Sequence, residues 1–138
     1  MRINVNWVAI LVSDIVLFLL GWLWYDVFFG NVWLTALRQV TPQVSMAFTW
    51  YPFVVSLVGG FFLAYGLALI LKWRGPVGPL EGAWIGFAFG LLIFGTMTWM
   101  DYVYSGWGVM LGLINVGFVA VGMGVIGAIL AVWRAKVA

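Results

Sequence analysis

The sequence has neither histidine nor cysteine, and it has very few charged residues. Without histidine, the chain lacks the commonest general base, zinc ligand and haem ligand. Without cysteine, it can form no disulfide, thiolate nucleophile or iron–sulfur cluster. Charged residues make up 7% of the 138 residues, whereas a soluble domain carries about 25%. Lipid must therefore solvate most of the surface, and we expect no enzymatic activity, no cofactor and no metal site.

Long apolar segments take the place of the missing charges. Hydrophobic residues make up 66% of the chain. A bilayer core of about 30 Å needs about 20 residues of helix, and four continuous apolar segments reach that length. The strands of a membrane barrel alternate in polarity and are about half as long. The sequence therefore predicts one all-α domain over residues 1–138, an integral membrane four-helix bundle with spans at about 7–25, 46–71, 82–102 and 109–133.

The distribution of basic residues predicts the orientation of these spans. With four spans, both termini and the loop after the second span lie on the same side of the bilayer. Basic residues concentrate on the cytoplasmic side of membrane proteins, so we expect both termini in the cytoplasm. The net charge of +2 is too small to indicate nucleic-acid binding. Five of the six basic residues lie on the predicted inner side (Arg2, Lys72, Arg74, Arg134 and Lys136), and Arg38 lies on the outer side.

A segment between the first two spans is apolar but too short to cross the bilayer. Asn31 can cap a helix there, and the helix is expected to stop before Thr41–Pro42 because proline disfavours helix in the residue before it. Its apolar residues then share one face. We predict a short interfacial helix on the outer leaflet at about 31–40, with Val32, Trp33, Ala36, Leu37 and Val40 on its apolar face.

Aromatic and acidic residues gather where spans one and three reach the outer surface. Tryptophan and tyrosine favour that depth, since an apolar ring body can stay in acyl chains and the polar edge in headgroups. The two ends resemble each other, through either an internal duplication or convergence on the same interfacial chemistry. The acids are solvated helix ends that can pair with Arg38, or the ligands of a divalent cation. The cluster consists of Trp24, Tyr25, Asp26, Trp33, Trp99 and Asp101.

Most of the eighteen glycines lie inside the spans, at spacings that place them on single helix faces. Small residues let helix backbones approach closely in lipid. A second small face on span four, formed by Gly108, Gly112, Asn115 and Gly122, predicts contact with another subunit, either in a homo-oligomer or in a larger membrane complex. The glycines expected to pack helices within the bundle are Gly60, Gly82, Gly86, Gly90, Gly117 and Gly124.

Asp14 is the acid that lies well inside a span. An unpaired carboxylate at such a depth costs about 2.5–3.5 kcal/mol on insertion scales. Counting along span two places Tyr65 at a similar depth, and we predict a hydrogen bond from its hydroxyl to Asp14. The carboxyl either handles protons or cations, or it specifies helix packing. Asn115 lies nearer the outer end of span four, where an interhelical hydrogen bond is the simpler interpretation.

Several segments resemble the small bacterial and archaeal membrane proteins grouped as domain of unknown function 1761. The first half contributes Asn6-Trp7, Gly21, Trp24-Tyr25, Phe29-Gly30 and Trp33. The second half contributes Leu80-Glu81-Gly82-Ala83, Gly86-Phe87, Asp101-Tyr102, Ile114-Asn115 with Gly117, Gly127-Ala128-Ile129-Leu130 and Trp133-Arg134. The resemblance implies a four-span fold and, with the basic residues, a prokaryotic cytoplasmic (inner) membrane location. It brings no established activity.

The chain departs from this family pattern in two places. Members usually have a glycine or serine and then a proline after Trp-Tyr, where this chain has Asp26-Val27. Many also carry a histidine shortly after the segment that matches Ile114–Gly117, and this chain has none. A role that depends on that histidine is therefore not expected here.

Three kinds of function are compatible with these patterns. The one we favour is a non-catalytic structural or accessory membrane protein, or a self-assembling subunit. The second is a small transporter or channel subunit that uses Asp14. The third is a protein that binds a lipophilic small molecule through Trp22, which lies about one turn away from the interfacial tryptophans, and its aromatic neighbours.

Overall fold

Helices account for all regular secondary structure in residues 4–41 and 50–134, the part of the chain that the computed structural model describes. The prediction of an all-α bundle of apolar helices is confirmed. Four helices are long and apolar enough to cross a membrane: Trp7–Phe28, Trp50–Arg74, Pro79–Tyr104 and Val109–Val132. The predicted start of span two at Met46 lies outside the described residues. The elements are α1 (Trp7–Trp22), η1 (Leu23–Phe28), α2 (Gly30–Val40), α3 (Trp50–Arg74), α4 (Pro79–Phe89), η2 (Gly90–Gly95), α5 (Thr96–Tyr104) and α6 (Val109–Val132).

Two of the long helices contain a π-helical turn, in which each N–H pairs with the carbonyl five residues earlier. The segment η1 extends α1, and its wider turn is closed by a 3.0 Å hydrogen bond from the Phe29 N–H to the Trp24 carbonyl. The segment η2 joins α4 to α5. Such turns are rare and often occur at functional sites. The first long helix therefore runs on to Phe28 and carries Trp24 and Tyr25 on its π-helical end.

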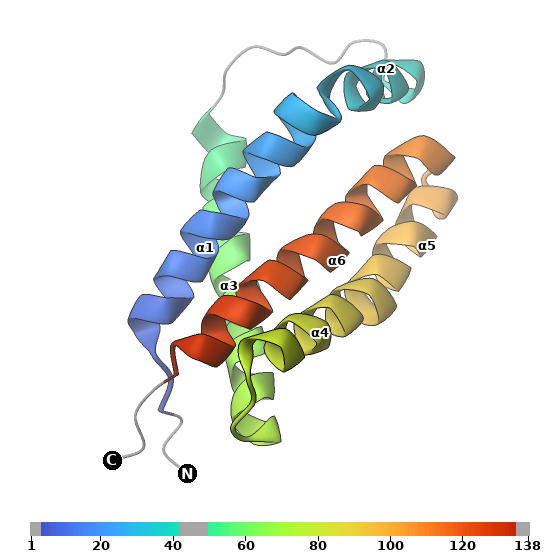
Figure 1. The fold of residues 1–138 in the computed structure, drawn as a ribbon. Coiled ribbons are helices and arrows are strands. Elements are labelled where there is room, and N and C mark those ends of the chain that lie inside the picture. Colours follow the sequence, from blue (N-terminus) through green and yellow to red (C-terminus); the bar gives the residue numbers. More distant parts are fainter. Residues whose placement is uncertain (1–3, 42–49, 135–138) are drawn as a thin grey trace.

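The glycines of the third long helix pack directly on the backbone of α6, which lies between α1 and the α4–α5 pair (Figure 1). A Cβ atom built on Gly82 would lie 2.5 Å from the Gly127 carbonyl oxygen, and one on Gly90 would lie 2.7 Å from the Val119 carbonyl oxygen. At Gly86, a Cβ would overlap the Met123 carbonyl. Only glycine permits such close approaches, so these glycines allow the backbones of α4–η2 and α6 to pack in direct contact.

The other side of α6 is filled by large side chains of the same chain. The sequence predicts that Gly112 and Gly122 belong to a face that contacts another subunit, and the structure corrects this. A Cβ on Gly112 would lie 2.9 Å from the Trp99 ring, and one on Gly122 would lie 2.7 Å from the Leu17 side chain. Periodicity identifies a small face, but it does not say which neighbour fills it.

The second long helix, α3, packs on the bundle mainly along half of its length. Its inner half buries Gly60, Ala64, Leu67 and Leu71, and the contacts come from α1 and α6. Every residue from 51 to 59 is exposed. In Figure 1 this helix lies behind α1. The outer half of α3 therefore has an apolar surface that the described part of the chain does not cover.

The predicted interfacial segment forms the short helix α2. It ends at Val40, as expected, with Thr41 as its C-cap. The proposed cap at Asn31 is wrong, because the helix already begins at Gly30 and Phe29 precedes it without a side-chain cap. The Trp33 N–H instead bonds the Phe29 carbonyl at 2.7 Å, which places Asn31 inside the first turn.

Candidate functional site

One polar and aromatic cluster joins η1 to α6. The Trp24 Nε1–H donates to the Ile114 carbonyl at 3.0 Å, and the Tyr25 hydroxyl donates to Asn115 Oδ1. The Asn115 Nδ2 in turn donates to the Leu111 carbonyl at 2.8 Å. The interhelical hydrogen bond expected at Asn115 is therefore present, and its partner is Tyr25.

Aromatic rings pack around these hydrogen bonds. The Tyr25 ring lies 5.2 Å from Phe118 and 5.6 Å from Trp33 of α2, the latter edge to face. The Trp24 ring lies against Gly117, where a Cβ would come within 3.1 Å of it. Because the polar edges of Trp24 and Tyr25 have partners and the rings interlock, this cluster fixes α1 and α2 on α6 and is best explained as structure.

The acids at the outer ends of spans one and three take no part in the hydrogen bonds of this cluster. Asp26 and Asp101 are both exposed. Trp99 is part-buried and packs on Gly112 of α6. Within residues 4–41 and 50–134, neither acid forms an ion pair with Arg38, and no three metal-ligating side chains gather. The geometry therefore brings together Trp24, Tyr25 and Trp33 from the predicted cluster, and leaves Asp26 and Asp101 on the surface.

Asp14 and Ser13 of α1 are a second group of buried polar residues, and Asp14 lies against α3. Asp14 is 7% exposed and Ser13 is fully buried. Neither the Asp14 Oδ1 nor the Ser13 Oγ has a hydrogen-bond partner among the described residues. Gly60 of α3 lies directly opposite, since a Cβ there would overlap the Asp14 Oδ1. Buried polar atoms almost always find a partner, so these two atoms require an explanation.

The predicted hydrogen bond between Tyr65 and Asp14 is not formed. The Tyr65 ring instead stacks on Trp7, with ring centroids 5.6 Å apart and planes 5° from parallel. Counting residues gave similar depths for the two side chains, but it could not give the rotation of α3 about its own axis. That rotation turns Gly60 toward Asp14. Tyr65, Asp14 and Asn115 are therefore three separate positions rather than one site.

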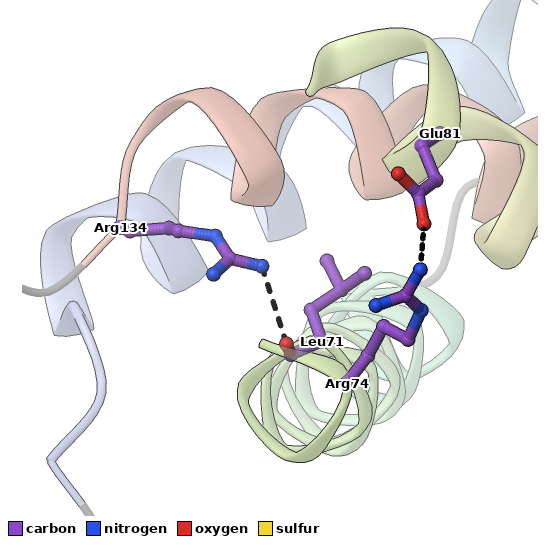
Figure 2. Close-up of polar contacts among 4 residues, drawn as sticks. All are labelled: Leu71, Arg74, Glu81 and Arg134. Atoms are coloured by element: carbon purple, nitrogen blue, oxygen red, sulfur yellow. Dashed lines mark hydrogen bonds and ion pairs between the residues drawn. The ribbon is translucent and has the colours of Figure 1, made fainter. Parts of the chain in front are cut away.

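At the inner end, basic residues are tied to neighbouring helices by contacts that the sequence analysis missed. Figure 2 shows the Arg134 guanidinium donating to the Leu71 carbonyl at 3.2 Å, and Arg74 paired with Glu81 at 2.7 Å. Lys72 also donates to the Asn4 carbonyl, at 3.1 Å. Bases in the last turn of α3 and an acid in the first turn of α4 suit the two helix dipoles, and that pattern could have revealed the Arg74–Glu81 pair.

Comparison with known proteins finds a family that matches most of the chain. The family described as "Protein of unknown function (DUF1761)" matches residues 8–131, which include most of all four long helices. No curated protein and no solved structure matches the chain significantly.

Proposed function

Since the chain belongs to the DUF1761 family, whose match covers nearly all of it, we propose that this membrane protein is a non-catalytic, self-assembling subunit. Two copies meet through the lipid-facing side of α3. The observation that carries this proposal is the environment of two glycines. Among the helix-interior glycines that the structure describes, Gly59 and Gly66 are the two at which an added Cβ would have nothing within 4 Å.

The other glycines within these helices explain why those two are informative. At each of them, an added Cβ would lie within 4 Å of another part of the same chain, and several would touch backbone directly. A glycine inside a helix costs about 1 kcal/mol relative to alanine, and close helix contact is the usual reason for its presence in membranes. Gly59 and Gly66 receive no such contact within the described chain, so a neighbouring molecule is the natural partner.

The geometry of α3 places both glycines on a single face. Seven residues correspond to nearly two full turns, and Phe62, which is 65% exposed, lies between them. This face is about 140° around the helix from Gly60 and the other packed residues. A large ring flanked by glycines one turn away on each side is self-complementary, because the ring of one copy fits the gap left by the glycines of the other.

The symmetry of a membrane dimer makes the proposal specific. Copies inserted in the same orientation are related by a two-fold axis along the membrane normal, so equivalent residues face each other across the contact. The seven-residue spacing of Gly59 and Gly66 favours the shallow, left-handed crossing of α3 on its symmetry mate. The outer half of α3, which the described chain leaves uncovered, becomes the contact surface.

Disulfide crosslinking tests this directly, because the natural chain has no cysteine. Gly59→Cys and Gly66→Cys are introduced separately and oxidised in native membranes. We expect each to form covalent dimers. Leu57→Cys is the matched control, since it lies near Gly59 in depth but about 160° around the helix. Absence of dimers at both glycine positions, or equal crosslinking at Leu57, would refute the proposed contact.

The orientation and location of the subunit belong to the same proposal. The first residue of α1 and the last of α6 lie at one end, where the Asn6 side chain donates to the Trp133 carbonyl at 3.2 Å. Lys72, Arg74 and Arg134 lie at that end too. By the positive-inside rule, we place this end in the cytoplasm and the protein in a prokaryotic inner membrane.

The binding of a lipophilic molecule at Trp22 has less support. Trp22 is 56% exposed, and its neighbours Trp24 and Tyr25 turn toward α6. A shallow apolar groove of about 410 Å³ lies at the opposite end, lined by Pro79, Ala128, Ile129, Val132 and Trp133. This groove includes neither Trp22 nor its neighbours Trp24 and Tyr25.

A further inference from the structure

Asp14 of α1 faces the outermost buried residue of α3. Gly60 is the first buried residue of α3, and residues 51–59 before it are all exposed. The Asp14 carboxyl rests directly over Gly60. The acid therefore lies at the outer limit of the buried part of α3.

Aromatic pairs border this position on both sides. Phe18 of α1 and Phe53 of α3 lie 5.8 Å apart toward the outer surface. Trp7 stacks on Tyr65 toward the inner surface. The two pairs leave a short apolar interval, and the Asp14 carboxyl is the polar group that projects across it toward Gly60.

The hydroxyl of Ser13, the residue before Asp14, also has no hydrogen-bond partner among the described residues. Two other hydroxyls within the helices do have partners. Ser56 and Thr96 donate to the carbonyls four residues earlier, both at 2.8 Å, as helical hydroxyls commonly do. The fully buried Ser13 Oγ makes no such bond. Asp14 and Ser13 are consecutive in α1, and each has a buried oxygen atom whose hydrogen-bonding capacity is unused within the described chain.

Among the residues that the structure describes, Asp14 forms no ion pair. In α3 the packed half carries Tyr65 as its titratable side chain, with the ring held against Trp7, and the first charged residue is Lys72 at the inner end. In α6 there is no titratable residue from Val109 to Val132, and in η1 the acid Asp26 lies at the far end of the helix.

We infer that Asp14, with Ser13 before it in the chain, forms a proton-binding site where α1 meets Gly60 of α3. The carboxylate takes up one proton from water, which forms an O–H bond on Asp14, and it returns the proton to water on release. Ser13 provides the adjacent hydroxyl that can bond the acid or a water molecule. An ionisable group inside a membrane span is a functional site by default, and we assign the proton as its ligand because no three metal-ligating side chains gather within the described part of the chain.

Modification with dicyclohexylcarbodiimide tests this site in the full-length protein in lipid vesicles. This apolar reagent adds to protonated carboxyls within membranes, so the carboxyl O–H adds across its C=N bond and a stable N-acylurea remains. We expect one adduct at Asp14 by mass spectrometry, formed progressively more slowly as the pH is raised. Asp14→Asn should abolish it, Asp26→Asn should leave it unchanged, and Ser13→Ala should shift its pH midpoint.

Three results would overturn the inference. The first is an unmodified Asp14 while Asp26 or Asp101 reacts, and the second is modification whose rate does not depend on pH. The third is protection of Asp14 by sodium ions at constant ionic strength, which would assign the site to a metal cation. The pH dependence is measured on the natural sequence, so the test does not depend on whether the variants fold. It is also independent of dimer formation through Gly59 and Gly66.

Discussion

Substituting one glycine of the α4–α6 contact gives the sharpest prediction about stability. Gly86 of α4 faces the backbone of α6, and a Cβ there would overlap the Met123 carbonyl oxygen and lie 2.7 Å from its carbon. Gly124 is on the same contact, but its Cβ would meet Ala83 and Phe87 at an ordinary 3.4 Å. Gly86→Ala and Gly124→Ala therefore make the same chemical change in the same interface, with and without a clash.

The expected magnitudes follow from two opposing effects. Overpacking costs about 1–3 kcal/mol, and the upper part of that range applies at Gly86 because backbone atoms cannot move aside as a side chain can. Alanine favours the helix over glycine by about 1 kcal/mol. We expect Gly86→Ala to lower the free energy of unfolding by about 1–2 kcal/mol. Gly124→Ala should be neutral or stabilising by up to about 1 kcal/mol.

Unfolding in mixed micelles measures both variants. The protein is titrated with sodium dodecyl sulfate, and the fluorescence of its ten tryptophans reports the loss of packing. If Gly86→Ala proved as stable as Gly124→Ala, the two helices would not be in backbone contact at this level, and the reasoning from glycine geometry would be wrong.

Three further predictions concern the outer cluster, the inner ion pair and the orientation. Tyr25→Phe removes the hydroxyl that bonds Asn115 and should lower the free energy of unfolding by about 0.5–1.5 kcal/mol in the same micelle titration; no change would show that the hydrogen bond contributes nothing. Glu81→Gln should change the free energy of unfolding by less than about 1 kcal/mol, because the side chains of Arg74 and Glu81 are 58% and 45% exposed. A larger loss would mean that the ion pair is shielded from water. Ser105→Cys should react with an impermeant maleimide in intact cells, whereas labelling only after permeabilisation would reverse the orientation.

The sequence was sufficient to predict the long helices, because continuous apolar segments have few other structures in lipid. The glycines of the third span were also predictable as a packing face, since Gly82, Gly86 and Gly90 recur every four residues. Periodicity does not encode the π-helical turn at Leu23–Phe28, which depends on a shift to i+5 hydrogen bonds. The first helix therefore extends further than its apolar pattern alone indicates.

The candidate sites were less predictable because they depend on which helices are neighbours and how each is rotated. Depth along the membrane suggested that Tyr65 meets Asp14, but the rotation of α3 presents Gly60 instead. The small residues Gly112 and Gly122 were correctly recognised as a face, yet Trp99 and Leu17 of the same chain fill it. The face at Gly59 and Gly66 has no partner within the described chain, and the sequence cannot distinguish it from the glycine faces that pack on neighbouring helices.

The most direct test of self-assembly is native mass spectrometry of the protein released gently from its own membranes. We expect a mass of two chains for the natural sequence, and a mass of one chain when Gly66→Leu fills the gap that receives Phe62. A single-chain mass for the natural protein, or a complex with other proteins that contains one copy of this chain, would contradict self-assembly through α3.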